Sequence, residues 1–137
     1  MPAAQVLDSY ALLALLRDEE GGEVVGRLLE RAGEMDQPLH MTEANYAEVQ
    51  HIIRRRDGDA AWEAVARELS AAPIEFHGID RRLADGAAHF KARYRISLAD
   101  AFAAALAKER KAPLVTGDPE FRQLEKEIRL VWLHSPA

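Results

Sequence analysis

The amino-acid sequence predicts an α/β fold with three layers, in which helices flank a central, mostly parallel sheet of five strands. Short apolar runs alternate with longer segments of helical periodicity along the chain. A length of 137 residues, of which 48% are hydrophobic, suffices for one domain with its own core. No Pro-, Gly- or Ser-rich linker and no repeat divides the chain. We therefore expect a single domain over residues 1–137.

The first half of the chain is expected to alternate between strands and helices. The strands are short and apolar, and the helices repeat apolar residues three or four positions apart. In order, these elements are strand 5–7, helix 8–17, helix 23–32, strand 38–41, helix 42–56 and helix 60–70. Asp8 and Thr42 are candidate N-caps of the helices that they begin. The first helix carries leucine on most of its sides, so we expect it to be buried or to contact a partner.

The second half continues the same alternation. Its elements are strand 74–77, helix 80–94, helix 98–111, strand 113–116, a short helix over 119–125 and strand 128–133. Asp80 and Ser97 are candidate N-caps. Gly117 removes a side chain where the backbone turns out of the fourth strand. Right-handed crossovers between parallel strands place helices on both faces of the sheet, which gives the three layers.

Two of the expected strands end directly in an aspartate. Asp8 follows Val6-Leu7, and Asp118 follows Val115-Thr116-Gly117. Ligands of open parallel sheets bind outside the carboxyl ends of the strands, where the strand order reverses. If the first and fourth strands are neighbours at that point, both carboxylates face one crevice. The alternative is that each aspartate is only the N-cap of the helix that follows it.

Two further acids favour a site. Asp100 lies one turn into the helix over 98–111, on a face that continues with alanines, where an unpaired buried charge would be costly. The alternative for Asp100 is ordinary first-turn placement, because the helix dipole favours an acid there. Glu48 lies at the edge of the buried face of the helix over 42–56. Glu43 points about 140° away on the same helix and is expected to be a surface acid.

The sequence blocks that contain these acids resemble the PIN domain family, and within it the VapC toxins of toxin–antitoxin pairs. The blocks are Val6-Leu7-Asp8-Ser9, Asn45-Tyr46-Ala47-Glu48-Val49, Ser97-Leu98-Ala99-Asp100-Ala101 and Thr116-Gly117-Asp118-Pro119-Glu120-Phe121. Any one block is a weak signal. Their order and spacing match the family from Asp8 to the last strand, and no acidic position departs from the pattern.

The resemblance implies an endoribonuclease that cleaves RNA phosphodiester bonds with Mg²⁺ or Mn²⁺, cations that prefer carboxylate and water oxygens. By similarity, the catalytic and metal-binding groups would be the acids Asp8, Glu48, Asp100 and Asp118. The polar side chains expected to hold these carboxylates in place are Ser9, Asn45 and Thr116. Because four like charges in one crevice repel, we expect at least one of these carboxyls to have a raised pKa without the metal.

The resemblance also implies partners for the chain. These are an RNA substrate, a small cognate antitoxin that inhibits the active site from the groove between the first and third helices, and a second copy in a homodimer. We expect no membrane association and a cytoplasmic location, since no leader segment is apparent and no apolar run approaches the ~20 residues that span a bilayer. The alternative function is a catalytically idle PIN-fold module that binds or scaffolds.

Composition narrows the chemistry further. The formal net charge of −5 argues against a protein that coats polyanions in general. Arg54-Arg55-Arg56 could contact an RNA backbone, but basic residues are favoured at a helix C-terminus in any case. The absence of cysteine excludes disulfides, a thiol nucleophile and Cys-ligated zinc. The five histidines show no metal-ligand spacing along the sequence, and the family requires none of them.

Overall fold

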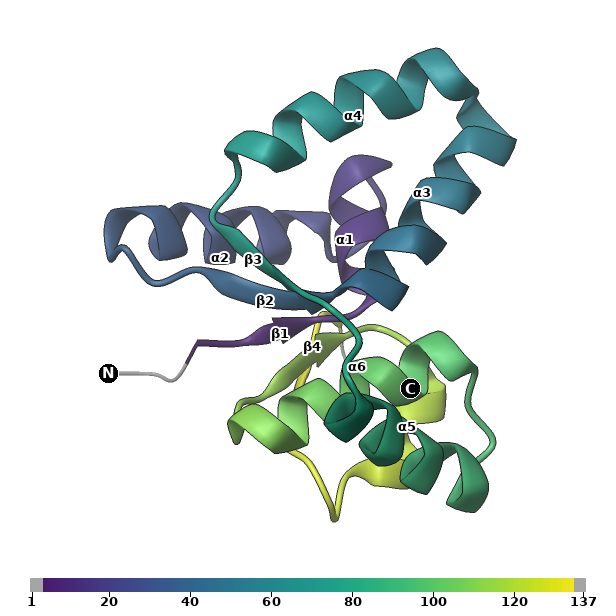
Figure 1. Ribbon diagram of the computed structural model, residues 1–137. Helices are drawn as coiled ribbons and strands as arrows, with labels where there is room; N and C mark the ends of the chain where they lie inside the picture. The colour runs from purple at the N-terminus through teal and green to yellow at the C-terminus, as the bar shows by residue number, and fades with distance from the viewer. Residues whose placement is uncertain (1–3, 135–137) are drawn as a thin grey trace.

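The computed structural model describes residues 4–134, so the first and last three residues of the expected domain lie outside the described range. Strands and helices alternate along the chain (Figure 1). In order, they are β1 (Val6–Leu7), α1 (Ser9–Leu16), α2 (Gly22–Glu34), β2 (Leu39–Thr42), α3 (Glu43–Asp57), α4 (Asp59–Ala71), β3 (Ile74–His77), α5 (Arg81–Arg93), α6 (Leu98–Arg110), β4 (Leu114–Thr116), the 3-10 helix η1 (Pro119–Leu124) and β5 (Leu130–Trp132). None of the described helices is long and apolar enough to cross a membrane.

The sheet has five strands, all parallel, in the order β3-β2-β1-β4-β5. Val6 of β1 pairs with His40 of β2 on one side and with Leu114 of β4 on the other. The chain winds from β1 towards β3 in one direction and then from β4 to β5 in the other, so the strand order reverses between β1 and β4. The first and fourth strands are therefore neighbours, which is the condition under which Asp8 and Asp118 are expected to face one crevice.

Helices cover both faces of the sheet, which confirms the three-layer α/β fold. Figure 1 shows α1 to α4 on one side of the sheet and α5 and α6 on the other. Side chains alternate between the two faces along β1. Leu7 packs in the apolar cluster with α1 to α4, and Val6 packs in the cluster with α5 and α6. Both residues are fully buried, so β1 lies at the centre of the molecule.

Helices α3, α5 and α6 start at the side chains that the sequence predicted as caps. Thr42, Asp80 and Ser97 each accept a hydrogen bond from the backbone N–H three residues further on, at 2.8–3.1 Å. Such a cap satisfies one of the N–H groups that the first turn of a helix leaves unpaired. The caps of α3 and α6 therefore fix where two helices begin, and each of these helices carries one of the predicted site acids.

The leucine-rich helix α1 is covered by the chain itself. Leu12 is fully buried, and the other three leucines of α1 are partly buried against the same apolar cluster. Gly22, at the start of α2, approaches α1 so closely that a Cβ there would lie 2.5 Å from the backbone oxygen of Ala14. Burial within the chain therefore accounts for much of this helix, and the expected contact with a partner stays a prediction.

Candidate active site

Asp8 lies directly after β1 and is fully buried. Its Oδ1 accepts a hydrogen bond from the backbone N–H of Ala11 at 2.8 Å, which caps α1. Its Oδ2 accepts a hydrogen bond from the hydroxyl of Thr116 at 2.5 Å. Thr116 ends the neighbouring strand β4, so this bond crosses the point at which the strand order reverses. Asp8 is therefore both an N-cap and a member of the crevice.

Thr116 also positions Asp118. The hydroxyl oxygen of Thr116 accepts a hydrogen bond from the backbone N–H of Asp118 at 3.0 Å. Asp118 Oδ1 in turn accepts one from the backbone N–H of Glu120 at 2.9 Å and caps η1. One buried hydroxyl group thus links the aspartates that follow β1 and β4.

Gly117 lies between these two residues, against the ring of Tyr10. A Cβ at position 117 would come within 2.2 Å of that ring, so the space there fits only a glycine. The Tyr10 side chain remains partly exposed. Burial and the charges of neighbouring acids, including Asp118 and Asp8, raise the pKa of its hydroxyl group. The phenol group therefore lies close enough to Asp8 and Asp118 for their charges to act on it.

Helices α6 and α3 bring two more acids to the same place. Asp100 lies in the first turn of α6 and is 8% exposed. Glu48 is half-buried on α3, and its charge acts on Asp100, whereas Glu43 is exposed, as the helical period predicted. The charges of Asp100 and Asp118 in turn act on Asp8. We call this set of Asp8, Glu48, Asp100 and Asp118 the acidic pocket.

Glu120 is an acid near the pocket that the sequence analysis did not assign. One carboxylate oxygen from each of Asp100, Asp118 and Glu120 lies within 4.8 Å of the other two, whereas Asp8 and Glu48 are outside that tight group. The only signal for Glu120 is its place two residues after Asp118 in the last sequence block. Its direction depends on the 3-10 turn at Pro119–Leu124, which the sequence did not distinguish from an α-helix.

Asn45 joins the segments that carry the acids. Its side chain is fully buried on α3. Its Nδ2 donates hydrogen bonds to the hydroxyl of Ser9 at 3.0 Å and to the backbone oxygen of Ala99 at 3.1 Å, while its Oδ1 accepts one from Thr42 at 2.5 Å. Ser9 and Ala99 each adjoin an aspartate of the acidic pocket in the sequence. A fully bonded buried amide of this kind fixes the relative positions of α1, α3 and α6.

Burial shifts the titration of the two most enclosed acids. It raises the pKa of Asp8 to about 8, although hydrogen bonds from Thr116 and Ala11 act in the opposite direction. The pKa of Asp100 is raised to about 7, first by burial and then by the charges of Asp118 and Glu48. Among the described residues, no basic side chain is one of the main influences on either carboxyl. This confirms the expectation of at least one raised pKa.

These residues fit a hard divalent cation. The pocket offers carboxylate oxygens from several segments, which is the ligand type that Mg²⁺ and Mn²⁺ prefer. Two of its carboxyls are buried and hold protons at pH values where carboxyls are normally ionised. A cation that entered the pocket would restore their ionised forms, because an opposite charge nearby lowers the pKa of a carboxyl.

Fold and site together define a class: a parallel α/β domain whose buried carboxylates gather at the carboxyl ends of its two central strands. The model of the PIN domain family matches residues 6–127. The chain belongs to the PIN domain family.

Known relatives agree with this assignment. The chain is 30% identical over 122 residues to ribonuclease VapC42 of Mycobacterium tuberculosis, an alignment that covers 83% of this chain and 86% of the relative. Its fold is similar to that of DNA-bound VapBC from Salmonella typhimurium, with a TM-score of 0.73, 16% identity and coverage of 96% and 99% of the two chains. It is also similar to a toxin–antitoxin complex from Klebsiella pneumoniae, with a TM-score of 0.70, 16% identity and coverage of 97% and 100%.

Proposed function

We propose that the chain is an endoribonuclease of the VapC type, the toxin of a toxin–antitoxin pair, which hydrolyses RNA phosphodiester bonds with Mg²⁺ or Mn²⁺. The observation that carries the proposal is the acidic pocket, in which carboxylates from four separate segments meet at the carboxyl ends of β1 and β4. A relative that is 30% identical over 122 residues is named a ribonuclease, which supports the same activity.

The acids have distinct roles in this proposal. Asp8, Asp100 and Asp118 would hold the cation, directly or through water, and Glu48 would complete a second metal position or orient the attacking water. When bound, the cation supplies hydroxide at neutral pH, alignment with the scissile phosphorus and neutralisation of the charge that develops on the phosphate. The contribution of the protein is to hold the carboxylates at fixed positions before the RNA arrives.

Three uncharged side chains provide that positioning. Thr116 donates a hydrogen bond to Asp8 and accepts one from the backbone of Asp118, so both aspartates depend on one hydroxyl group. Asn45 donates hydrogen bonds to Ser9 and to the backbone beside Asp100. Such supporting bonds orient ligand carboxylates, and their loss typically lowers metal affinity or activity by about 10–100-fold.

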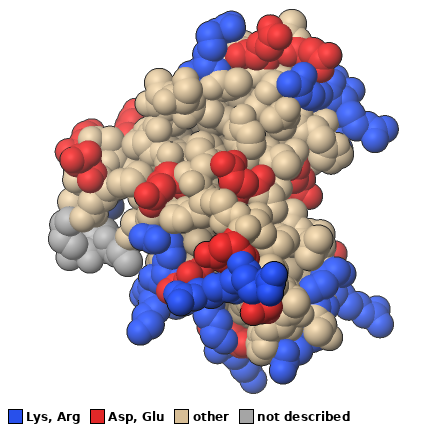
Figure 2. Space-filling model, in the orientation of Figure 1, with Lys and Arg blue, Asp and Glu red and all other residues tan. Residues whose placement is uncertain are grey.

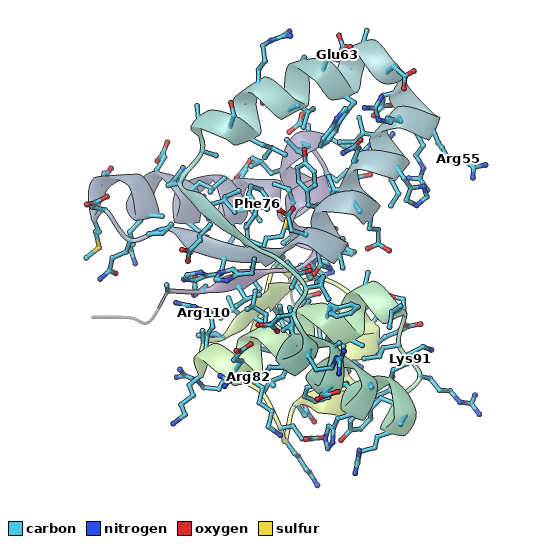
Figure 3. All side chains as sticks on the ribbon, in the orientation of Figure 1. Arg55, Glu63, Phe76, Arg82, Lys91 and Arg110 are labelled. Carbon is cyan, nitrogen blue, oxygen red and sulfur yellow. The ribbon has the colours of Figure 1, made fainter. Side chains whose placement is uncertain are left out.

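The basic side chains of α5 are the best-placed RNA contacts. Figure 2 shows Lys and Arg gathered over the part of the molecule formed by α5 and α6. Figure 3 shows Arg82 and Lys91 of α5 projecting away from the protein, and Arg55 at the far end of α3. Arg54, next to Arg55, is already paired with Asp59 at 2.8 Å. Arg82 itself lies 3.8 Å from Glu109, so within α5 we assign the phosphate contact to Lys91.

The proposal includes a protein inhibitor and a second copy of the chain. Solved structures with a similar fold include a toxin–antitoxin complex and a DNA-bound VapBC. A cognate antitoxin would inhibit by placing a basic side chain among the acids, where it replaces the charge of the cation. We also propose a homodimer and a cytoplasmic location. Expression of the chain without its antitoxin is expected to be toxic, and Asp8→Asn is expected to relieve that toxicity.

The direct test is cleavage of total RNA by the purified chain in the presence of Mg²⁺, Mn²⁺ or EDTA. We expect cleavage that requires the cation and is lost in Asp100→Asn. Glu48→Gln and Glu43→Gln form a matched pair on α3: the first should lower the cleavage rate and the second should leave it unchanged, because Glu43 points into solvent.

Two results would contradict the proposal. Cleavage that survives Asp100→Asn would mean that the acidic pocket is not the site. No cleavage with either cation, from folded protein free of a bound inhibitor, would instead favour the catalytically idle binding module.

A further inference from the structure

A second polar cluster lies on the other half of the sheet. It consists of His40 on β2 and of Glu75 and His77 on β3, and we call it the histidine cluster. Glu75 and His77 are two positions apart in a strand, so they share one face, and His40 pairs with Glu75 across the two strands. Phe76 between them packs in the apolar cluster of α1 to α4, so the histidine cluster faces the side of α5 and α6.

Three ligand atoms converge in the histidine cluster. His40 Nδ1 lies 2.8 Å from His77 Nε2 and 3.1 Å from Glu75 Oε2, and His77 Nε2 lies 3.3 Å from the same oxygen. A tetrahedral Zn²⁺ with bonds of about 2.0–2.1 Å holds its ligand atoms about 3.3 Å apart. The three atoms therefore form nearly the triangle that one face of such a coordination sphere requires, and His40 Nδ1 needs to move slightly away from the other two atoms.

His40 is the most enclosed member of the histidine cluster. The side chain of His40 is only 4% exposed. Burial, followed by the charges of Arg110 and His77, lowers the pKa of His40 to about 4, although Glu75 acts in the opposite direction. Because His40 Nδ1 and His77 Nε2 lie 2.8 Å apart, one of these two nitrogens carries the proton that they share, and a cation would displace it. The hydrogen bond between the two rings uses the lone pair of only one nitrogen. A bound cation would instead accept a lone pair from each of the three ligand atoms, on His40, Glu75 and His77.

The charge near the cluster selects the kind of cation. Arg110, at the end of α6, is on the α5 and α6 side of the sheet (Figure 3). The positive charge of Arg110 disfavours a metal cation in the histidine cluster. The carboxylate of Glu75, the only one in the cluster, offsets this repulsion only in part. A hard cation that is bound mainly by charge is thus disfavoured. A borderline cation that forms strong bonds to imidazole nitrogen is favoured.

We propose that His40, Glu75 and His77 form a transition-metal site that takes Zn²⁺ or a similar borderline cation. The Glu75 and His77 side chains are 54% and 21% exposed, so a water molecule can occupy the fourth position. The bound cation ties the edge strand β3 to β2, because the ligands come from both strands. This site is separate from the acidic pocket, whose donors are oxygen atoms only.

The test is Zn²⁺ binding to the full chain, measured by competition with a chromogenic chelator. Asp100→Asn serves as the parent protein, since it weakens cation binding in the acidic pocket. We expect one equivalent of Zn²⁺ in this parent, and a fall in affinity of about 100-fold or more in His77→Ala, since even a lost supporting bond costs 10–100-fold. His51→Ala, at an exposed histidine of α3, is the matched control and should bind as the parent does.

Co²⁺ provides a second readout, because a four-coordinate Co²⁺ absorbs visible light much more strongly than a six-coordinate one. The strong absorption should appear in the parent and in His51→Ala, and disappear in His77→Ala. Circular dichroism in the presence of a chelator checks that each variant is folded. Glu75→Gln, at an exposed position, supplies the same comparison if His77→Ala does not fold.

Equal Zn²⁺ affinity in the parent and in His77→Ala would overturn the proposal, as would a Zn²⁺ site in the wild type that Asp100→Asn removes. These results do not depend on RNA cleavage, so failure of the metal site and failure of the nuclease proposal are distinguishable.

Discussion

The acidic pocket and the histidine cluster lie on one sheet, but burial shifts the pKa values of their side chains in opposite directions. Burial raises the pKa of Asp8 and Asp100 to about 8 and about 7, so these carboxyls hold protons near neutral pH. Burial lowers the pKa of His40 to about 4, so its ring has lost its extra proton well below neutral pH. A cation must displace carboxyl protons from the first site, and from the second only the proton that the two facing histidine nitrogens share. The difference follows from one cause, since burial always disfavours the charged form.

The two sites also differ in how the chain builds them. The residues of the acidic pocket follow strands or lie in helices, and they come from segments far apart in the sequence. Side-chain hydrogen bonds from Thr116 and Asn45 then hold these segments together. The histidine cluster stands on two neighbouring strands, and the backbone register alone aligns it. We therefore expect the acidic pocket to be sensitive to its supporting residues and the histidine cluster to depend on its ligands.

The largest effect is expected from Asp8→Asn. The amide keeps the shape of the side chain but removes a carboxylate that we propose as a cation ligand, so RNA cleavage should fall by about 1000-fold, or about 4 kcal/mol in the barrier. Zn²⁺ binding at the histidine cluster should not change. Single-turnover cleavage and the chelator competition measure the two effects on the same protein sample. A parallel loss of Zn²⁺ binding would show that the two sites are not separate.

A smaller effect is expected from Asn45→Ala. The substitution leaves the hydroxyl of Ser9 and the backbone oxygen of Ala99 without their buried partner, which should cost about 2–3 kcal/mol of the free energy of unfolding. RNA cleavage should fall as well. Gln50→Ala on the same helix removes only an exposed hydrogen bond with Arg54 and should change stability by less than about 0.5 kcal/mol. Equal urea midpoints for the two variants would count against the role of Asn45.

The pH dependence of stability comes next. The acids have a folded-state pKa above their ordinary value of 3.8, so they stabilise the fold at low pH and this contribution is lost as the pH rises towards 8. His40 acts oppositely between its folded value of about 4 and its ordinary 6.5, where stability rises with pH. Above pH 6.5 the acids dominate, and each protonated carboxyl lowers the free energy of unfolding by up to about 1.4 kcal/mol per pH unit.

Urea unfolding in EDTA between pH 6.5 and pH 8 measures this slope. Asp100→Asn should reduce it, because the amide does not titrate. Added Mg²⁺ should restore stability most at pH 8, where the acids lose their protons most easily. A stability that is constant or rises over this interval would contradict the assignment of raised pKa values to the pocket.

The smallest effect is expected from Glu75→Gln without metal. The side chain is 54% exposed, so the loss of its charge should change the free energy of unfolding in EDTA by less than about 0.5 kcal/mol. The melting temperature in EDTA should therefore hardly change. With Zn²⁺, the wild type should gain stability through ligand binding and the variant should gain much less. A large loss of stability in EDTA would mean that the carboxylate supports the fold itself.

Much of the fold and of the acidic pocket could be predicted from the sequence. Thr42, Asp80 and Ser97 begin helices as predicted, since a cap depends only on residues within one turn. The helical period separated Glu48 from Glu43 for the same reason. The roles of the acids in catalysis stay predictions until the variants are measured.

The histidine cluster could not be predicted in this way. Glu75 and His77 share a face by the two-residue period of a strand, but His40 lies 35 positions before Glu75 in the sequence. Their approach depends on the pairing of Leu39–Thr42 with Ile74–His77, and on which face of the sheet these residues occupy. The histidines have no ligand spacing along the sequence, and only the pairing of β2 with β3 brings His40 Nδ1 within 2.8 Å of His77 Nε2.

The sequence by itself determined the local elements, their caps and the acids that end the strands, because periodicity and capping act over a few residues. Only the tertiary structure decided the strand order β3-β2-β1-β4-β5, the pairing of His40 with Glu75, the direction of Glu120 and the proton affinity of the buried groups. These properties depend on which distant segments pack against each other and bury the side chains between them. That burial exists only when the whole sheet and its two helical layers have packed.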